Sequence, residues 1–212
     1  ILSSDVTSFY PNLAIRNKWS PAHLPKDIFC EQYEWFFNER KKIPKSDPRN
    51  YVYKIILNAT YGLTNQENNY LYDPEMTMRI TINGQLSLMM LYAMLLENVP
   101  GAIPIMQNTD GLETLIPENQ KEKYLSICKE WEKITNLNLE HDQYQKMIVP
   151  DVNNYIALHQ WKEISIEDYT KLNADGVSIV KLENGIGYHA KTKCKGRFEF
   201  PKALHKNKSN QI

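Results

Sequence analysis

Apolar and polar positions in the first third of the chain predict a strand followed by two helices. Residues 1–15 begin as a strand. Apolar and aromatic residues then recur at helical spacing from Ser20 to Pro44, and again in residues 50–63. Pro44 and Pro48 separate the two stretches with a short basic turn, so the pattern predicts a helical hairpin.

The middle of the chain predicts a long helix, a β-hairpin and a further helix. Residues 81–97 form an amphipathic pattern, and we expect its apolar stripe to face the core. The stripe consists of Ile82, Leu86, Met89, Met90, Ala93 and Leu96. Residues 103–107 and 112–116 predict two short strands joined by a turn that carries Asp-Gly, which is a strong hairpin signal. Residues 118–136 predict another helix.

The last part of the chain predicts further strands. Residues 146–159 read as one strand, and residues 177–193 as a strand that folds back at Asn184-Gly185. The order of strand, helical insertion, helix, hairpin, helix and strands indicates an α+β fold with an antiparallel sheet backed by helices. It does not indicate a doubly wound parallel sheet.

Composition is that of a globular protein, and charge is unevenly distributed along it. Hydrophobic residues make up 42% and charged residues 24% of 212 residues, and 25 basic residues balance 25 acidic ones. Residues 40–54 hold six basic residues and one acidic residue, and residues 181–208 hold eight and two. Such segregation suits a polyanionic ligand, although two solvated faces would show it as well.

Cysteines and apolar runs exclude several classes of protein. The three cysteines lie far apart and none is part of a C-x-x-C pair, so they predict neither a zinc site nor a disulfide framework and favour an intracellular setting. The longest apolar run, residues 86–96, is too short to cross a bilayer, so we expect no membrane partner. The chain starts at Ile1 without a signal peptide, and we expect it to be part of a longer protein.

Three segments carry residues suited to phosphate chemistry. Asp5 ends the first strand and Asp110 lies at the hairpin tip, so their carboxylates would bridge two divalent ions if the strands are neighbours. Lys54, Asn58 and Tyr61 lie on one helix at positions i, i+4 and i+7, and therefore on roughly one face.

These segments resemble the motifs of family B DNA polymerases. Residues 5–11 (D-V-T-S-F-Y-P) resemble motif A, D-x-x-S-L-Y-P, and residues 54–62 (K-I-I-L-N-A-T-Y-G) resemble motif B, K-x-x-x-N-S-x-Y-G. Residues 108–111 (N-T-D-G) resemble motif C, D-T-D-S. Residues 37–41 resemble the fingers segment that supplies a triphosphate-binding Arg, and residues 193–196 resemble the K-x-K-G stretch before the thumb. The matches occur in the family order.

The resemblance implies roles for individual residues. The metal ligands would be the catalytic pair Asp5 and Asp110, with the Val6 carbonyl. Nucleotide-binding residues would be Ser8, Phe9, Tyr10, Arg40, Lys45, Lys54 and Asn58. Template and primer contacts would be Tyr61, Gly62, Asn108, Thr109, Asn153, Asn154, Tyr155, Lys193 and Lys195. We expect the chain to turn at Pro11, which would place the ring of Tyr10 under the sugar, where it excludes a 2′-hydroxyl.

The sequence departs from the family pattern at several positions. Asn108 stands for the first acid of motif C, and Gly111 for its Ser. The family pattern has a second cation four residues after the Arg of the fingers. In this chain Pro44 occupies that position, and Lys45 follows one position later. Residues 152–155 (V-N-N-Y) lack both lysines of the K-K-x-Y segment that grips duplex DNA, so phosphate affinity there should be lower.

The resemblance also implies an architecture and an activity. Residues 1–18 and 65–198 would form the palm of a right-hand polymerase, residues 19–64 its helical fingers, and residues 199–212 the start of a thumb. The expected enzyme is a DNA-directed DNA polymerase that uses two Mg²⁺ ions, with Mn²⁺ as an alternative, although an isolated fragment need not be active. Its partners would be primer-template DNA, a deoxynucleoside triphosphate, and the exonuclease and thumb of a parent chain.

The compact fingers favour a phage or viral source. That source would place the protein in the bacterial cytoplasm, or in the nucleus or cytoplasm for a eukaryotic virus.

Two other functions remain open. A reverse transcriptase or RNA-dependent RNA polymerase also uses two palm aspartates, but its hairpin usually carries two adjacent acids, where this chain has Asp110-Gly111. A non-catalytic nucleic-acid-binding remnant of a polymerase would explain Asn108 and the missing lysines. Convergence of Asp5 and Asp110 on a common ion would distinguish an enzyme from such a remnant.

Overall fold

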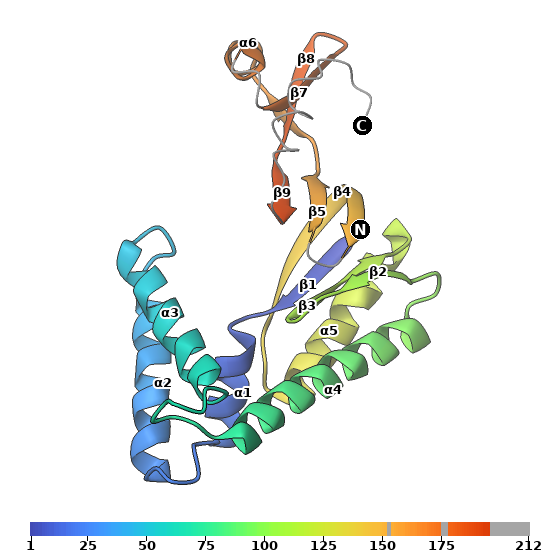
Figure 1. Cartoon of the computed structure of the whole chain (residues 1–212). Helices are drawn as coiled ribbons and strands as arrows, with labels where there is room; N and C mark the ends of the chain where they lie inside the picture. The colour runs from blue at the N-terminus through green and yellow to red at the C-terminus, as the bar shows by residue number, and fades with distance from the viewer. Residues whose placement is uncertain (152–153, 175–177, 196–212) are drawn as a thin grey trace. The chain divides into compact units, whose positions relative to one another are not determined.

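The computed structural model describes residues 1–151, 154–174 and 178–195, which form six α-helices and nine strands (Figure 1). This confirms the predicted α+β class. The first elements are β1 (Leu2–Val6), α1 (Phe9–Asn17), α2 (Lys26–Lys42), α3 (Pro48–Leu63), α4 (Pro74–Asn98), β2 (Ile103–Gln107), β3 (Gly111–Leu115) and α5 (Lys121–Thr135). The remaining elements are β4 (Leu139–Asp151), β5 (Asn154–His159), β6 (Lys162–Ile164), α6 (Ile166–Ala174), β7 (Ile179–Glu183), β8 (Ile186–Ala190) and β9 (Thr192–Lys195).

The chain divides into two compact units. The first comprises Ile1–Ser4, Gly101–Pro117 and the chain from His141 onward. The second comprises Asp5–Pro100 and Glu118–Glu140. The first unit is therefore mostly sheet, and the second contains helices α1 to α5.

The larger sheet has the strand order β2-β3-β1-β4-β5-β9. The β2–β3 hairpin confirms the predicted strands around Asp-Gly. The prediction of one strand over residues 146–159 is wrong, because β4 and β5 pair antiparallel as two strands. Asp151 and Asn154 form the last pair of that ladder, and the Asn154 Nδ2 donates to Asp151 Oδ2 at 2.7 Å. Asp and Asn favour turns, which explains the break.

A smaller sheet with the order β6-β8-β7 carries helix α6, which the sequence did not predict. The hairpin at Asn184-Gly185 is confirmed, and both residues have the positive φ that a tight hairpin turn requires (52° and 79°). Gly187 lets α6 approach β8, because a Cβ there would lie 2.8 Å from the Cβ of Tyr169.

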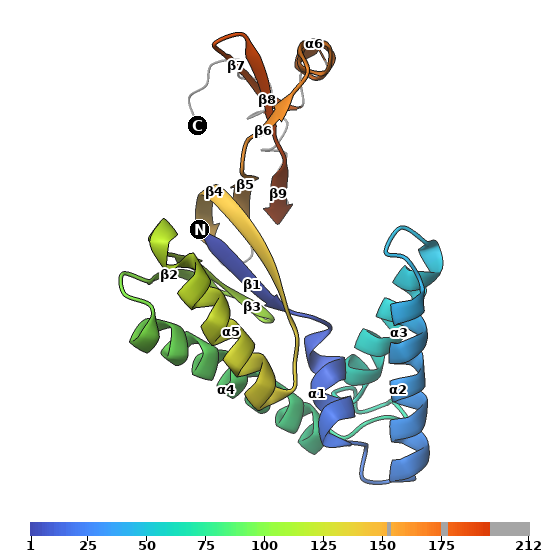
Figure 2. The same ribbon diagram turned by 180° about the vertical axis from the view of Figure 1, so that it is seen from behind.

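The predicted helical hairpin in the second unit is confirmed as α2 and α3, which lie side by side in both ribbon views (Figure 2). Helix α2 begins at Lys26, after Pro25, and therefore starts later than Ser20. Helix α3 begins with Pro48 at its first position, and Asp47 accepts a hydrogen bond from the Arg49 N–H.

Buried residues of these helices form one core with α1 and α4. The cluster consists of Ala14, Tyr33, Phe37, Leu57, Met76 and Ile80.

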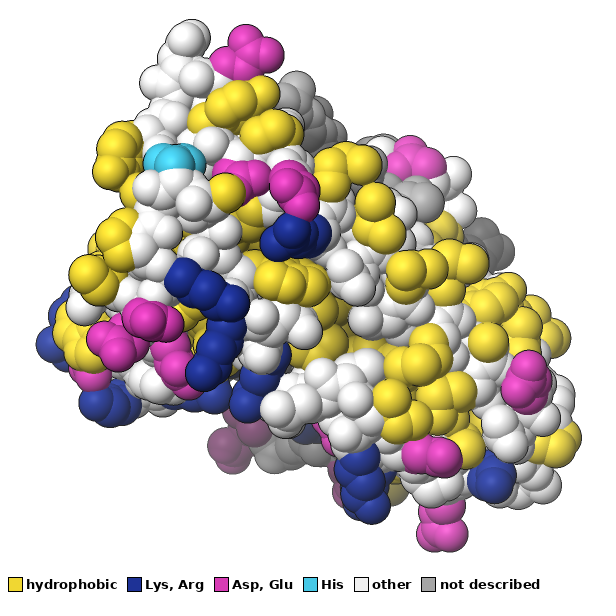
Figure 3. All heavy atoms as spheres, turned by 90° about the horizontal axis from the view of Figure 1, so that it is seen from below, with side chains coloured by type: hydrophobic (Ala, Val, Ile, Leu, Met, Phe, Trp, Pro, Cys, Tyr) yellow, Lys and Arg dark blue, Asp and Glu magenta, His cyan; other side chains and the backbone are white. Residues whose placement is uncertain are grey.

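Helix α4 buries the face opposite to the one that the sequence predicted. Its buried residues are Met76, Ile80, Gly84, Leu88, Leu91 and Leu95. The expected core stripe is largely exposed: Leu86 and Met89 are 57% and 59% accessible, and Ile82 and Leu96 are exposed too. Hydrophobic side chains gather on the face of the molecule that Figure 3 shows.

Gly84 lies on the buried face of α4, where the helix meets α1. A Cβ at this position would lie 3.2 Å from the ring of Tyr10, so the glycine allows α1 to pack closely there. Among the described residues α4 is also the one helix long and apolar enough to cross a membrane by length and composition alone, a test that core helices pass as well.

Candidate active site

The junction between β1 and α1 forms an unusual backbone turn at Ser8. This residue precedes α1 and adopts a left-handed conformation, with φ 47° and ψ 50°, which costs a non-glycine residue about 1 kcal/mol. The expected turn at Pro11 is wrong, because Pro11 is the third residue of α1. Proline is tolerated there, since the N–H groups of a first helical turn have no partner within the helix.

Arg40 of α2 reaches back to this junction. Its Nη1 donates to the Oγ of Ser8 at 2.8 Å, and its Nε donates to the Oδ1 of Asn50 at 3.3 Å. The Ser8 hydroxyl makes no capping bond to α1. Burial lowers the pKa of the Arg40 guanidinium, whereas the nearby Glu140 carboxylate raises it. The structure thus brings together Ser8 and Arg40, two of the predicted nucleotide-binding residues.

Tyr10 lies where α1, α3 and α4 meet. Its ring centroid is 4.7 Å from that of Tyr61, and it also stacks on Phe9 with centroids 5.6 Å apart. Tyr10 is half-buried and packs against the core of the second unit, and Phe9 is buried. Burial raises the pKa of the Tyr61 hydroxyl. The segments that resemble motifs A and B therefore contact each other through two aromatic rings.

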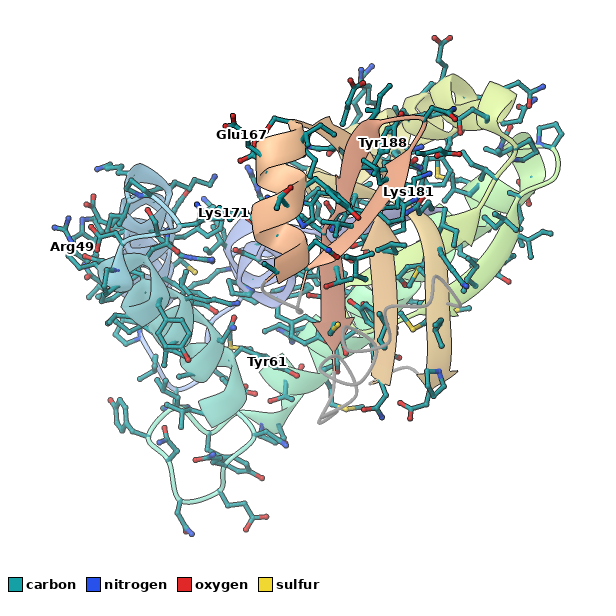
Figure 4. The ribbon with its side chains drawn as sticks, turned by 90° about the horizontal axis from the view of Figure 1, so that it is seen from above. Arg49, Tyr61, Glu167, Lys171, Lys181 and Tyr188 are labelled. Carbon is teal, nitrogen blue, oxygen red and sulfur yellow. The ribbon has the colours of Figure 1, made fainter. Side chains whose placement is uncertain are left out.

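The other predicted residues of α3 lie along the helix. Lys54 and Asn58 are exposed. The half-buried Tyr61 lies three residues after Asn58, on roughly the same face of the helix. Figure 4 shows Arg49 and Tyr61 at opposite ends of this helix. Apart from its chain neighbours and the backbone of its own helix, no atom of the described residues lies within 4 Å of a Cβ built on Gly62, so a side chain there would meet open space among them.

Lys45 is paired with an acid that the sequence had not singled out. Its Nζ lies 3.1 Å and 3.2 Å from the two carboxylate oxygens of Glu140, and both side chains are exposed. Exposed ion pairs contribute little stability, so an anionic ligand would displace Glu140 at low cost.

The hairpin tip in the first unit is organised by Asn108. Its Oδ1 accepts from the backbone N–H of Asp110 at 3.0 Å and of Gly111 at 2.8 Å, and its own N–H donates to the Gly111 carbonyl. An aspartate could accept the same two bonds, so Asn108 preserves the shape of the turn. The carboxylate of Asp110 is exposed at the tip.

Apart from Tyr61 and Gly62 of α3, the residues predicted to contact template and primer fall in the first unit. Lys193 lies 3.3 Å from the carboxylate of Asp142, which also accepts from the Tyr144 hydroxyl at 3.0 Å. Burial raises the pKa of Asp142, but the bonds from Tyr144 and Lys193 outweigh it and leave the pKa lowered. Burial raises the pKa of Tyr144 to about 12. Asp142 had not been predicted from the sequence.

The remaining template and primer residues have mixed surroundings. Tyr155 is buried in the core cluster around Tyr144, and its backbone pairs with that of Lys195 between β5 and β9. Asn154 is bonded to Asp151, Thr109 is exposed at the hairpin tip, and Asn153 lies outside the described residues.

The candidate metal ligands belong to different units, Asp5 to the second and Asp110 to the first. Within the described ranges no three His, Cys, Asp or Glu side chains cluster in a way that would hold a metal ion. The donors proposed from the sequence are two carboxylates and the Val6 carbonyl. These are the oxygen ligands that Mg²⁺ takes, and because this ion keeps several waters, a small protein donor set fits it.

Comparison with known proteins finds a similarity in structure but none in sequence. No protein-family model and no curated protein matches the chain. Among solved structures, the chain is similar to the family B DNA polymerase from the hyperthermophilic archaeon Pyrobaculum calidifontis, with a TM-score of 0.50 and 18% sequence identity. The match covers 75% of this chain and 26% of that polymerase, so the chain spans about a quarter of its length. At this identity the likeness concerns the fold alone.

Proposed function

We propose that the chain is the catalytic core of a template-directed DNA polymerase of the family B type, which adds deoxynucleotides to a primer 3′-hydroxyl. The hydrogen bond from Arg40 to Ser8 carries the proposal. It joins the fingers-like segment to the motif A-like segment across 32 residues of sequence, and the Tyr10–Tyr61 contact joins motif A to motif B. The fold likeness to a polymerase supports it.

The second unit would bind the incoming triphosphate. Arg40 offers a planar guanidinium that can hold two phosphate oxygens at once, and Lys54 adds an exposed charge on α3. The first N–H groups of α1, which Ser8 leaves uncapped, are donors of the type that bind phosphate at helix N-termini. Phe9 contributes its backbone N–H there. Asn58 would bind the nucleotide beside Lys54, and Lys45 would exchange Glu140 for phosphate.

Asp5, Asp110 and the Val6 carbonyl would hold two Mg²⁺ ions, with Mn²⁺ as a substitute. When bound, such ions activate the primer 3′-hydroxyl and neutralise the leaving pyrophosphate. The chain's own contribution is to present carboxylates at the end of β1 and at the β2–β3 turn. Tyr10 would restrict space at the sugar.

The wider architecture is part of the same proposal. Residues 1–18 and 65–198 would be the palm, and residues 19–64, with α2 and α3, the fingers; the start of a thumb, residues 199–212, lies outside the described residues. Primer-template DNA would contact Tyr61, Gly62, the hairpin tip and the β5–β9 region. An exonuclease and a thumb would belong to a longer parent chain, and a phage or viral source would place the protein inside an infected cell.

Primer extension tests this function. The protein, in the longest form that can be expressed, should extend a labelled primer on a DNA template with Mg²⁺ and deoxynucleotides, and chelation with EDTA should stop it. Asp5→Asn should lower the rate by on the order of a thousandfold while DNA binding and thermal unfolding stay near the parent's. Equal extension by Asp5→Asn would refute the proposed mechanism.

A non-catalytic nucleic-acid-binding remnant is the second candidate. Val152 and Asn153 in place of the two lysines of the K-K-x-Y segment, and Asn108 in place of an acid, favour it. The same assay separates the two functions, since a remnant would bind primer-template DNA without extending it under any metal condition.

A further inference from the structure

We propose that Asn50, which lies outside every motif that the sequence presents, is a positioning residue that aims Arg40 at the triphosphate. This inference rests on the proposed polymerase function. Asn50 lies in the first turn of α3 and is 8% exposed, and a buried amide of this kind normally satisfies its polar atoms with specific partners.

The side chain of Asn50 joins the end of α2 to the start of α3. Its Nδ2 donates to the carbonyl of Ile43 at 2.7 Å and to that of Arg40 at 3.3 Å. The last carbonyls of a helix have no partner within the helix, so Asn50 supplies a cap to α2 from a neighbouring helix. Its Oδ1 accepts from the Nε of Arg40 at 3.3 Å.

These partners fix the orientation of the amide. Carbonyl oxygens only accept and the Arg Nε–H only donates, so the NH₂ group must face the two carbonyls and the oxygen must face Arg40. A flipped amide would place like groups against each other at all three contacts. One side chain therefore holds both the backbone and the guanidinium of Arg40.

Arg40 is held in place while its charge stays available. In the described part of the chain its hydrogen-bond partners are the neutral side chains of Asn50 and Ser8, and it forms no ion pair. Two neighbouring cations in the same basic segment are neutralised, since Lys45 pairs with Glu140 and Arg49 with Asp47. An anionic ligand at Arg40 would thus have no hydrogen-bonded carboxylate to displace, because the nearby Glu140 is paired with Lys45.

Fixing the guanidinium before the nucleotide arrives should strengthen binding. Ordering a long, flexible side chain costs rotamer entropy, and part of that cost is met on folding when Asn50 already orients it. The effect should therefore appear in KM for the deoxynucleotide more than in kcat.

The first test compares KM and kcat for deoxynucleotide incorporation in matched variants. Asn50→Ala should raise KM about tenfold and change kcat by less than about threefold. Asn50→Asp keeps the shape but adds a carboxylate that pairs with Arg40, so it should raise KM at least as much. Tyr33→Phe is the control: it removes another buried α2–α3 bond, from the Tyr33 hydroxyl to the Leu57 carbonyl at 2.8 Å, and should leave KM unchanged.

A double-mutant cycle separates positioning from general stability. If Asn50 acts through Arg40, then Asn50→Ala or Asn50→Asp should add less than about twofold to KM in an Arg40→Ala background. A tenfold increase in that background, or an equal rise in KM for Tyr33→Phe, would overturn the role of Asn50. Failure of the parent protein to extend primers would refute the proposed function instead, before any variant is made.

Discussion

The two parts of the candidate site are held together in different ways. In the second unit, Ser8, Arg40 and Asn50 come from three elements, and the Ser8–Arg40 bond spans 32 residues of sequence. In the first unit, the hairpin tip is organised by bonds from Asn108 to residues two and three positions away. The nucleotide side thus depends on how helices pack, whereas the shape of the Asp110 turn depends on its own four residues.

This difference predicts different responses to substitution. A change in the packing of α2 against α3 should alter the nucleotide side at a distance, as the Asn50 variants would. The hairpin tip should tolerate distant changes and respond to substitutions within the turn.

The largest expected effect is within the hairpin tip. Asp110→Ala should lower primer extension by on the order of a thousandfold, because it removes a proposed metal ligand and leaves the turn bonds intact. Asn108→Ala should cost much less, since it removes the two bonds to backbone N–H groups but no proposed ligand. Single-turnover rates measure both variants, and equal losses would mean that the ligand within this turn is wrongly assigned.

A smaller effect is expected at Tyr10, which packs among the helices of the second unit. Tyr10→Ala should raise ribonucleotide incorporation relative to deoxynucleotide incorporation by about tenfold or more, because it removes the ring proposed to exclude the 2′-hydroxyl. Tyr10→Phe keeps the ring and should leave the ratio unchanged. Since Tyr10 also packs on Tyr61, Tyr10→Ala should unfold at a lower temperature.

A purely structural Tyr10 would give another result. Tyr10→Ala and Tyr10→Val would then reduce incorporation of both kinds of nucleotide in parallel with the loss in thermal stability. An unchanged ratio in a well-folded Tyr10→Ala protein would remove sugar selection from the account.

The smallest expected effect is a pH-dependent loss of stability at Asp73. This carboxylate caps α4 by accepting from the Met76 N–H, and it also accepts from the Ala22 N–H at 2.7 Å. Burial raises its pKa, but these bonds outweigh burial and lower it. A lowered folded-state pKa means that the stabilisation is present above about pH 4, the unfolded value, and is lost as the pH falls through the folded value.

Asp73→Ala should therefore reduce the free energy of unfolding by about 1 kcal/mol at pH 7, with a smaller difference at pH 3. Urea unfolding at the two pH values measures it. Asp73→Asn, whose single amide oxygen can still accept one of the two bonds, is the control and should lose less at pH 7. The same loss at both pH values for Asp73→Ala would show that the ionised carboxylate does not provide the stabilisation.

Local signals in the sequence predicted the local features correctly. Asp-Gly and Asn-Gly predicted both hairpins, and Pro44 and Pro48 predicted the break between α2 and α3. The break between β4 and β5 was missed although turn-favouring residues, Asp151 and Asn154, stand at it, because the apolar residues on both sides fit one continuous strand.

Features that depend on packing were less predictable. Helix α4 is apolar on two faces, and periodicity alone does not say which face is buried; Gly84 lies on the buried face, in close approach to Tyr10. Asn50, Glu140 and Asp142 were missed for a related reason. Each acquires its role from a partner on another element, 10 residues away for Asn50, 95 for Glu140 and 51 for Asp142, and a single Asn or acidic residue in a helix or strand carries no signal of that partner.

The most direct test of the central claim is an experimental structure of the protein with primer-template DNA, a non-hydrolysable deoxynucleotide and Mn²⁺ in place of Mg²⁺. Anomalous scattering would locate the ions. The account predicts two ions about 4 Å apart, with carboxylate oxygens of both Asp5 and Asp110 among their ligands and Arg40 on the triphosphate. Ions bound by only one of the two aspartates, or a nucleotide bound away from Arg40, would contradict it.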